Sequence, residues 1–193
     1  MEQTIESVSE PAPERAPLSA YAPPTAPRTE PAPSPEHALG TSLGGAAVRG
    51  ALAGAIGGLA LLATERAGSA ALLPEGEQAS AGGDAARALA DARGAELSPA
   101  QTTAAGAGLA LGYCALLGAV YGVVQRRLRP PDALHGLLLG GLSFAATSSK
   151  RGLLPRLGAQ PPAATQPVER SAVPLLSHAA YGLTTAMAFD LLS

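Results

Sequence analysis

The chain has 193 residues, a formal net charge of −2, and 15% charged residues, well below the roughly 25% of an ordinary soluble domain. This charge excludes the broad basic surface that binds nucleic acid, so no nucleic-acid partner is expected. Apolar residues make up 47% of the chain and aromatic residues only 3%. The composition favours an all-α integral membrane protein; the alternative is a soluble, alanine-rich helical protein.

The chain begins with a proline-rich segment: its first 36 residues hold nine prolines among Ala, Glu, Ser and Thr. Such a segment cannot bury enough apolar surface to offset the entropy lost on ordering. We predict a disordered tail over 1–40 and a four-span membrane domain over 41–193. No basic stretch followed by an apolar core, typical of a signal peptide, is present, so we expect insertion to rely on the internal spans.

Four stretches have the composition of membrane-spanning helices: 46–64, 103–124, 133–149 and 172–192. The second is the clearest, because it holds no charge and no proline and, at about 1.5 Å per residue, covers the hydrocarbon thickness of a bilayer. The third is short for a full crossing, and Pro174 is expected in the first turn of the fourth. Together they predict a four-helix bundle made of two helix hairpins.

The connections between these spans are expected to be mostly irregular. In the first, over 67–101, residues 85–95 predict at most a short surface helix, and the last, over 150–170, is proline-rich. The middle connection is short and holds Arg126, Arg127 and Arg129. Because basic residues in short loops favour the cytoplasmic side, we predict that both termini are cytoplasmic.

Small residues recur every four positions on one face of the first span. They are Ala46, Gly50, Gly54 and Gly58, and the second span has a similar stripe at Cys114, Gly118 and Gly122. Small residues at this spacing allow close approach of another membrane helix. We therefore predict that Gly50, Gly54, Gly58, Gly118 and Gly122 lie at helix-packing positions.

The two halves of the membrane domain resemble each other. Gly57-Gly58-Leu59 in the first span matches Gly140-Gly141-Leu142 in the third, and Tyr121-Gly122 in the second matches Tyr181-Gly182 in the fourth. Because the unit is a helix pair, the halves keep the same orientation. This predicts a parallel repeat with a pseudo-twofold axis along the membrane normal.

Short motifs near the span ends carry a family resemblance: Glu65 with Leu72-Leu73-Pro74, His135-Gly136, Leu154-Pro155-Arg156-Leu157-Gly158 with Pro161-Pro162, Glu169, Ser177-His178 and Tyr181-Gly182. On these motifs the chain resembles the YagU-like family of small inner-membrane proteins over most of 45–192. The resemblance implies a multi-pass protein of the bacterial inner membrane, a loose link to acid tolerance, and no substrate. That family carries a histidine late in the third span, where this chain has Thr147-Ser148, so a role resting on that histidine does not transfer.

His178 is the most informative polar residue because it lies inside a predicted span. Ionisable residues are rare there and face protein or water rather than lipid. Tyr181 shares its helical face, and Glu65 closes the first span. The functional interpretation is a proton or ligand site formed by these residues; the alternative for His178 is a hydrogen bond that holds two helices together.

Other chemistry finds little support in the sequence. Residues 40–44 fit a G-x-S-x-G pattern, but no strand precedes them to strain the serine into a nucleophile elbow. No spacing of His and Cys indicates a metal site, and no phosphate loop or dinucleotide motif is present. We expect a protein that is not an enzyme and binds no cofactor.

Two classes of function follow from these features. The favoured one is a structural or interaction protein that partners membrane lipid, a second copy of itself or another membrane protein through its glycine faces. The alternative is a proton- or small-solute-transport protein that uses His178. Whether His178 lines a cavity or packs against another helix distinguishes them.

Overall fold

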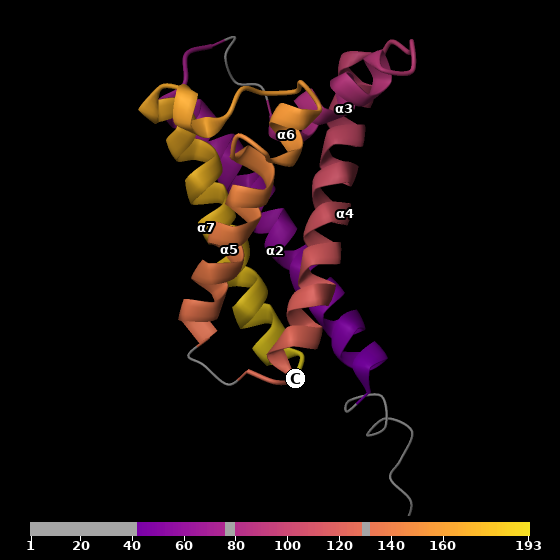
Figure 1. The fold of residues 1–193 in the computed structure, drawn as a ribbon, viewed down its shortest axis with the longest axis vertical. Helices are drawn as coiled ribbons and strands as arrows, with labels where there is room; N and C mark the ends of the chain where they lie inside the picture. Colours follow the sequence, from indigo (N-terminus) through magenta and orange to yellow (C-terminus); the bar gives the residue numbers. More distant parts are fainter. Residues whose placement is uncertain (1–41, 76–79, 129–131) are drawn as a thin grey trace, which may run out of the picture. The chain divides into compact units, whose positions relative to one another are not determined.

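The computed structural model describes residues 42–75, 80–128 and 132–193. The predicted tail over 1–40 lies outside the described residues. Within the described ranges the protein is all-helical and contains no strand (Figure 1). Its elements are α2 (Leu43–Leu72), α3 (Ala81–Asp91), α4 (Pro99–Gln125), α5 (Asp132–Ser148), α6 (Leu153–Arg156), the 3-10 turn η1 (Ala163–Thr165) and α7 (Val168–Leu191).

Capping residues set where the long helices begin. The Ser42 hydroxyl accepts a hydrogen bond from the Gly45 N–H at 2.9 Å and opens α2. At α4, Ser98 and Gln101 form a capping box, with Pro99 in the first turn. The predicted end of the first helix at residue 64 was too early, because a charged residue does not break a helix, and α2 continues to Leu72, shortly before Pro74.

Two further predictions need correction, one about Pro174 in the last long helix and one about the connection before that helix. Pro174 lies in the second turn of α7 rather than in the first, because the helix begins at Val168. The proline-rich connection over 150–170 is not wholly irregular, since it contains α6 and η1. These two short elements and α3 lie at one end of the helices (Figure 1), hereafter the loop end.

Helix α2 packs against both α4 and α7, and its contact with α4 is made by glycine. A Cβ atom added to Gly54 would lie 2.8 Å from the Cα of Gly118, and one added to Gly50 would lie 2.9 Å from the Cα of Gly122. Because these distances leave no room for a side chain, Gly50 and Gly54 of the predicted stripe lie directly against the backbone of α4, whereas Gly58 faces the side chains of Cys114 and Leu111.

Helices α5 and α7 form a second glycine contact. A Cβ atom on Gly182 of α7 would lie 2.9 Å from the Cα of Gly140 on α5. The two predicted hairpins therefore use the same kind of packing, but their other contacts are not equivalent. Helix α2 packs against α7, with Gly57 facing the Tyr181 carbonyl, whereas α5 packs on α7 and α6 rather than on α4. The packing in the described residues thus lacks the predicted pseudo-twofold relation.

Two helices of the described chain, α2 and α4, are long and apolar enough to cross a bilayer. Helix α5 is shorter, at 17 residues, and α7 carries Glu169, Arg170 and Asp190 close to its ends. The third and fourth spans therefore remain predictions at this point.

Candidate functional site

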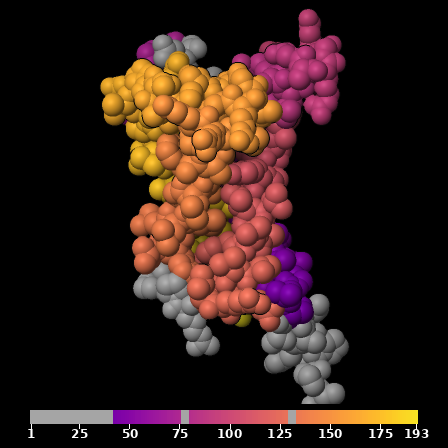
Figure 2. All heavy atoms as spheres, viewed as in Figure 1, coloured from indigo at the N-terminus to yellow at the C-terminus, as the bar shows by residue number. Residues whose placement is uncertain are grey.

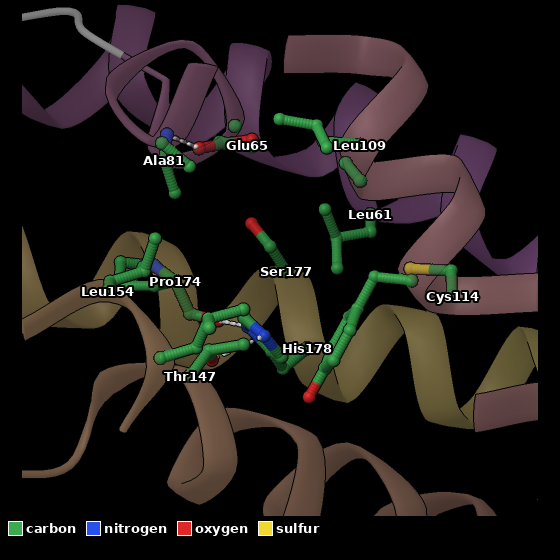
Figure 3. Close-up of a pocket in the computed structure, with 15 residues that line it drawn as sticks. Leu61, Glu65, Ala81, Leu109, Cys114, Thr147, Leu154, Pro174, Ser177 and His178 are labelled. Carbon is green, nitrogen blue, oxygen red and sulfur yellow. Dashed lines mark hydrogen bonds between the residues drawn. The ribbon is translucent and has the colours of Figure 1, made fainter. Parts of the chain in front are cut away.

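A small cavity lies between α2, α4, α6 and α7, near the loop end. It has a volume of about 100 Å³ and is lined mainly by apolar side chains, among them Leu61, Leu109 and Leu154. Its lining also includes Tyr113 and Cys114 of α4, and the two side chains that titrate nearest to neutral pH, Glu65 of α2 and His178 of α7, which Figure 3 shows on different sides of it. Residues 113 positions apart in the sequence (178 − 65) are thus brought to one site.

Both ring nitrogens of His178 have hydrogen-bond partners inside the protein. Nδ1 lies 2.7 Å from the carbonyl oxygen of Pro174, one turn earlier in α7. Nε2 lies 3.1 Å from the hydroxyl of Thr147 on α5. Because a carbonyl oxygen only accepts, Nδ1 must carry a hydrogen. His178 therefore lines the cavity and also bonds a neighbouring helix.

The Thr147 hydroxyl fits either protonation state of His178. When the ring is neutral, the hydroxyl donates its hydrogen to Nε2. When the ring is protonated, Nε2 donates instead, and the hydroxyl can turn to the Ser143 carbonyl oxygen, 2.9 Å away. Gaining or losing a proton at His178 thus requires the rotation of one hydroxyl and leaves no ring nitrogen unpaired.

Glu65 holds the start of α3 beside the cavity. Its Oε1 accepts a hydrogen bond from the Ala81 N–H at 2.8 Å, an arrangement that also suits the positive end of the helix dipole. Helix α3 is tied to the connection before α7 as well, because Gln160 donates to Asp84 at 2.7 Å. Helix α3 therefore lies over the cavity with polar contacts on two sides.

A second, more polar cavity of about 190 Å³ adjoins the first at the loop end. Its lining includes Ser69, Asp84, Gln166 and Arg170. Glu65, Ala81 and Pro174 line both cavities. The carboxylate of Glu65 thus lies where the polar cavity adjoins the mainly apolar cavity that contains His178.

Tyr181 is buried between the helices and lines neither of these two cavities. Its side chain is fully buried, and its hydroxyl donates to the Cys114 carbonyl oxygen of α4 at 2.9 Å. The Thr185 hydroxyl in turn donates to the Tyr181 carbonyl oxygen at 2.7 Å. Of the three polar residues singled out in the sequence, the structure brings Glu65 and His178 to one cavity and places Tyr181 in the helix packing.

Several residues of this site have no functional role among the predictions from the sequence. Thr147, the interhelical partner of His178, was noted only as a departure from a family pattern, and Leu154 of α6 was assigned to a loop. The available signal was the pair of hydroxyls at Thr147-Ser148, which ends an otherwise apolar stretch. His135 lies apart from the site and pairs with Gln125 at 2.6 Å at the other end of α5.

No group of three or more His, Cys, Asp or Glu side chains with the geometry to hold a metal ion occurs within residues 42–75, 80–128 and 132–193. The chain was also compared with known proteins: no family model, curated protein or solved structure matches it.

Proposed function

We propose that this protein is a four-span bundle of the bacterial inner membrane that takes up protons, or a small polar solute, through the cavity of Glu65 and His178. Membrane placement is supported by α2 and α4 and by large apolar side chains that point outward from four helices. Five of these, each at least 55% exposed, are Leu52, Leu59, Leu116, Leu142 and Met187. An apolar surface on every long helix suits lipid better than water.

We also propose that the chain belongs to the YagU-like family and that both of its termini are cytoplasmic. With that orientation the loop end faces the periplasm, together with the polar cavity and Glu65. The proposal assigns no enzymatic reaction and no cofactor to the protein.

The observation that carries the proposal is that Glu65 and His178 line one cavity with otherwise mostly apolar walls. Ionisable residues at membrane depth are costly and mark proton relays or ion pathways. The polar cavity can hold water beside Glu65, and a volume of about 100 Å³ leaves the apolar cavity room for a few water molecules. The Thr147 hydroxyl then lets His178 exist in either protonation state.

An interaction role is the second candidate, and one observation favours it. Gly108 and Gly112 form a small-residue pair on α4, and an added Cβ atom at either would meet nothing within 4 Å. The predicted glycines Gly50, Gly54, Gly118 and Gly122 are occupied by the contact between α2 and α4. The pair on α4 is therefore the place where another membrane helix can approach closely.

Proton uptake by vesicles containing the purified protein tests the proposal. With a pH-sensitive dye inside and an acidic medium outside, we expect proton entry above that of protein-free vesicles. Glu65→Gln keeps an oxygen that accepts from the Ala81 N–H but cannot ionise, so we expect entry to fall to the protein-free level. The matched control is Glu169→Gln, which removes an exposed carboxylate at the start of α7. Equal entry in the wild type, both variants and protein-free vesicles would favour the interaction role instead.

A further inference from the structure

Helices α4 and α5 are consecutive and antiparallel, yet they do not pack along their lengths: they meet near the connection, where Gln125 and Tyr121 contact His135. Residues 126–131 connect them, and short connections of this kind usually join helices that are packed neighbours. Here α5 packs on α7, and a groove of about 480 Å³ remains between α4 and α5. Figure 2 shows the surface hollowed between these two helices.

The walls of the groove are bulky and apolar. They include Leu117, Val120 and Val124 from α4 and Leu138 and Leu142 from α5. Membrane helices approach each other closely where their residues are small. Branched side chains on both walls therefore suit a flexible acyl chain better than another helix.

Polar groups are confined to few places in the groove. The Ser143 hydroxyl on α5 is 2% exposed and lacks a hydrogen-bond partner within the described part of the protein. At the end away from the loop end, Gln125 and His135 line the groove as a hydrogen-bonded pair. The groove therefore has an apolar length and a polar end, as an amphipathic occupant requires.

Positive charge flanks the polar end. Gln125 and Leu128 both line the groove, and the exposed side chains of Arg126 and Arg127 lie between them in the chain. Helix α4 carries no acidic residue, and α5 carries one, Asp132, at its first position. Basic sites between membrane helices on the cytoplasmic side bind the phosphates of anionic lipids.

We propose that the groove between α4 and α5 binds one anionic phospholipid. An acyl chain lies along the leucine and valine walls, and the phosphate lies at the end that carries Arg126 and Arg127. The inference rests on the membrane placement of the proposed function and not on proton uptake by Glu65 and His178.

Native mass spectrometry of protein taken from vesicles with equal amounts of phosphatidylglycerol and phosphatidylcholine tests this binding. We expect one retained lipid per chain, with phosphatidylglycerol favoured roughly tenfold or more, since each arginine near the surface adds attraction for anionic lipid. Replacing both arginines, by Arg126→Gln and Arg127→Gln, is expected to abolish the preference. Val120→Trp fills the groove and is expected to reduce retention of both lipids.

Matched controls change similar residues elsewhere. Lys150→Gln with Arg151→Gln removes two charges at the loop end, and Leu52→Trp enlarges an exposed side chain of α2 outside the groove; both should retain phosphatidylglycerol like the wild type. Equal retention of the two lipids, or none, overturns the proposal. So does a dimer that Val120→Trp converts to monomer, because the groove would then bind a second copy. A protein that stays soluble without detergent refutes the membrane placement itself, whereas absent proton uptake with lipid retained refutes only the cavity function.

Discussion

Replacing Gly54 by leucine is expected to leave the protein in the membrane but to lower its stability in detergent by on the order of 1–3 kcal/mol, the usual cost of overpacking. A Cβ atom at this position would already lie 2.8 Å from the Cα of Gly118, so a leucine side chain must push α2 away from α4. The change makes the helix more apolar, so insertion should not suffer. Thermal unfolding of the purified protein in detergent measures the effect.

Leu52→Phe is the matched control for this change. Leu52 lies on the same helix but is 55% exposed, so a larger apolar side chain there meets no neighbouring helix. We expect it to melt with the wild type. If Gly54→Leu also melted with the wild type, α2 and α4 would not pack through their glycine faces, and the arrangement of the other helices around α2 would lose its main support.

Two single variants, His178→Phe and Thr147→Val, are expected to distinguish the role of His178 in proton uptake from its role in helix packing. His178→Phe removes both ring nitrogens and should abolish proton entry into vesicles. Thr147→Val keeps the titratable ring but removes its bond to α5, and leaving a buried ring nitrogen unpaired costs about 1–3 kcal/mol. We therefore expect lower heat resistance in Thr147→Val, with proton entry reduced but not abolished, because the ring can still titrate without its hydroxyl partner.

The two variants decide between the two interpretations of His178. Proton entry and thermal unfolding are measured on each, with Ser171→Ala, a hydroxyl removed from α7 away from the cavity, as the control. If His178→Phe and Thr147→Val lose stability alike and neither changes proton entry, His178 holds the helices together and does nothing more. The cavity would then have no part in proton uptake.

Much of the helical arrangement was predictable from local residue patterns. Apolar runs placed the four long helices, three of them within about four residues of their bounds, whereas α2 continues eight residues beyond its predicted end. The every-fourth-residue spacing from Ala46 to Gly58 indicated one face of α2, and that face lies against α4. These features depend on residues that are close together along the chain, so they can be recognised from the sequence alone.

The rest of the fold, and the candidate site, depend on contacts between residues far apart in the chain. The internal similarity of the halves suggested equivalent hairpins, but the packing of α2 on α7 breaks that equivalence. Glu65 was identified as a polar residue, yet its bond to Ala81 arises only because α3 folds back over α2. Likewise Thr147 meets His178 only through the pairing of α5 with α7. No spacing in the sequence indicates these pairings.

Extraction of bacterial membranes with alkaline carbonate tests most directly whether the protein is embedded in the bilayer, on which the proposed proton uptake and the proposed lipid binding both depend. The full-length chain is expressed, membranes are sedimented before and after treatment, and both fractions are probed for the protein. We expect it to stay with the sedimented membrane, because apolar side chains exposed on four helices would have to enter water on release. Release of the full-length chain into the supernatant would contradict the membrane placement and indicate a soluble, alanine-rich helical protein.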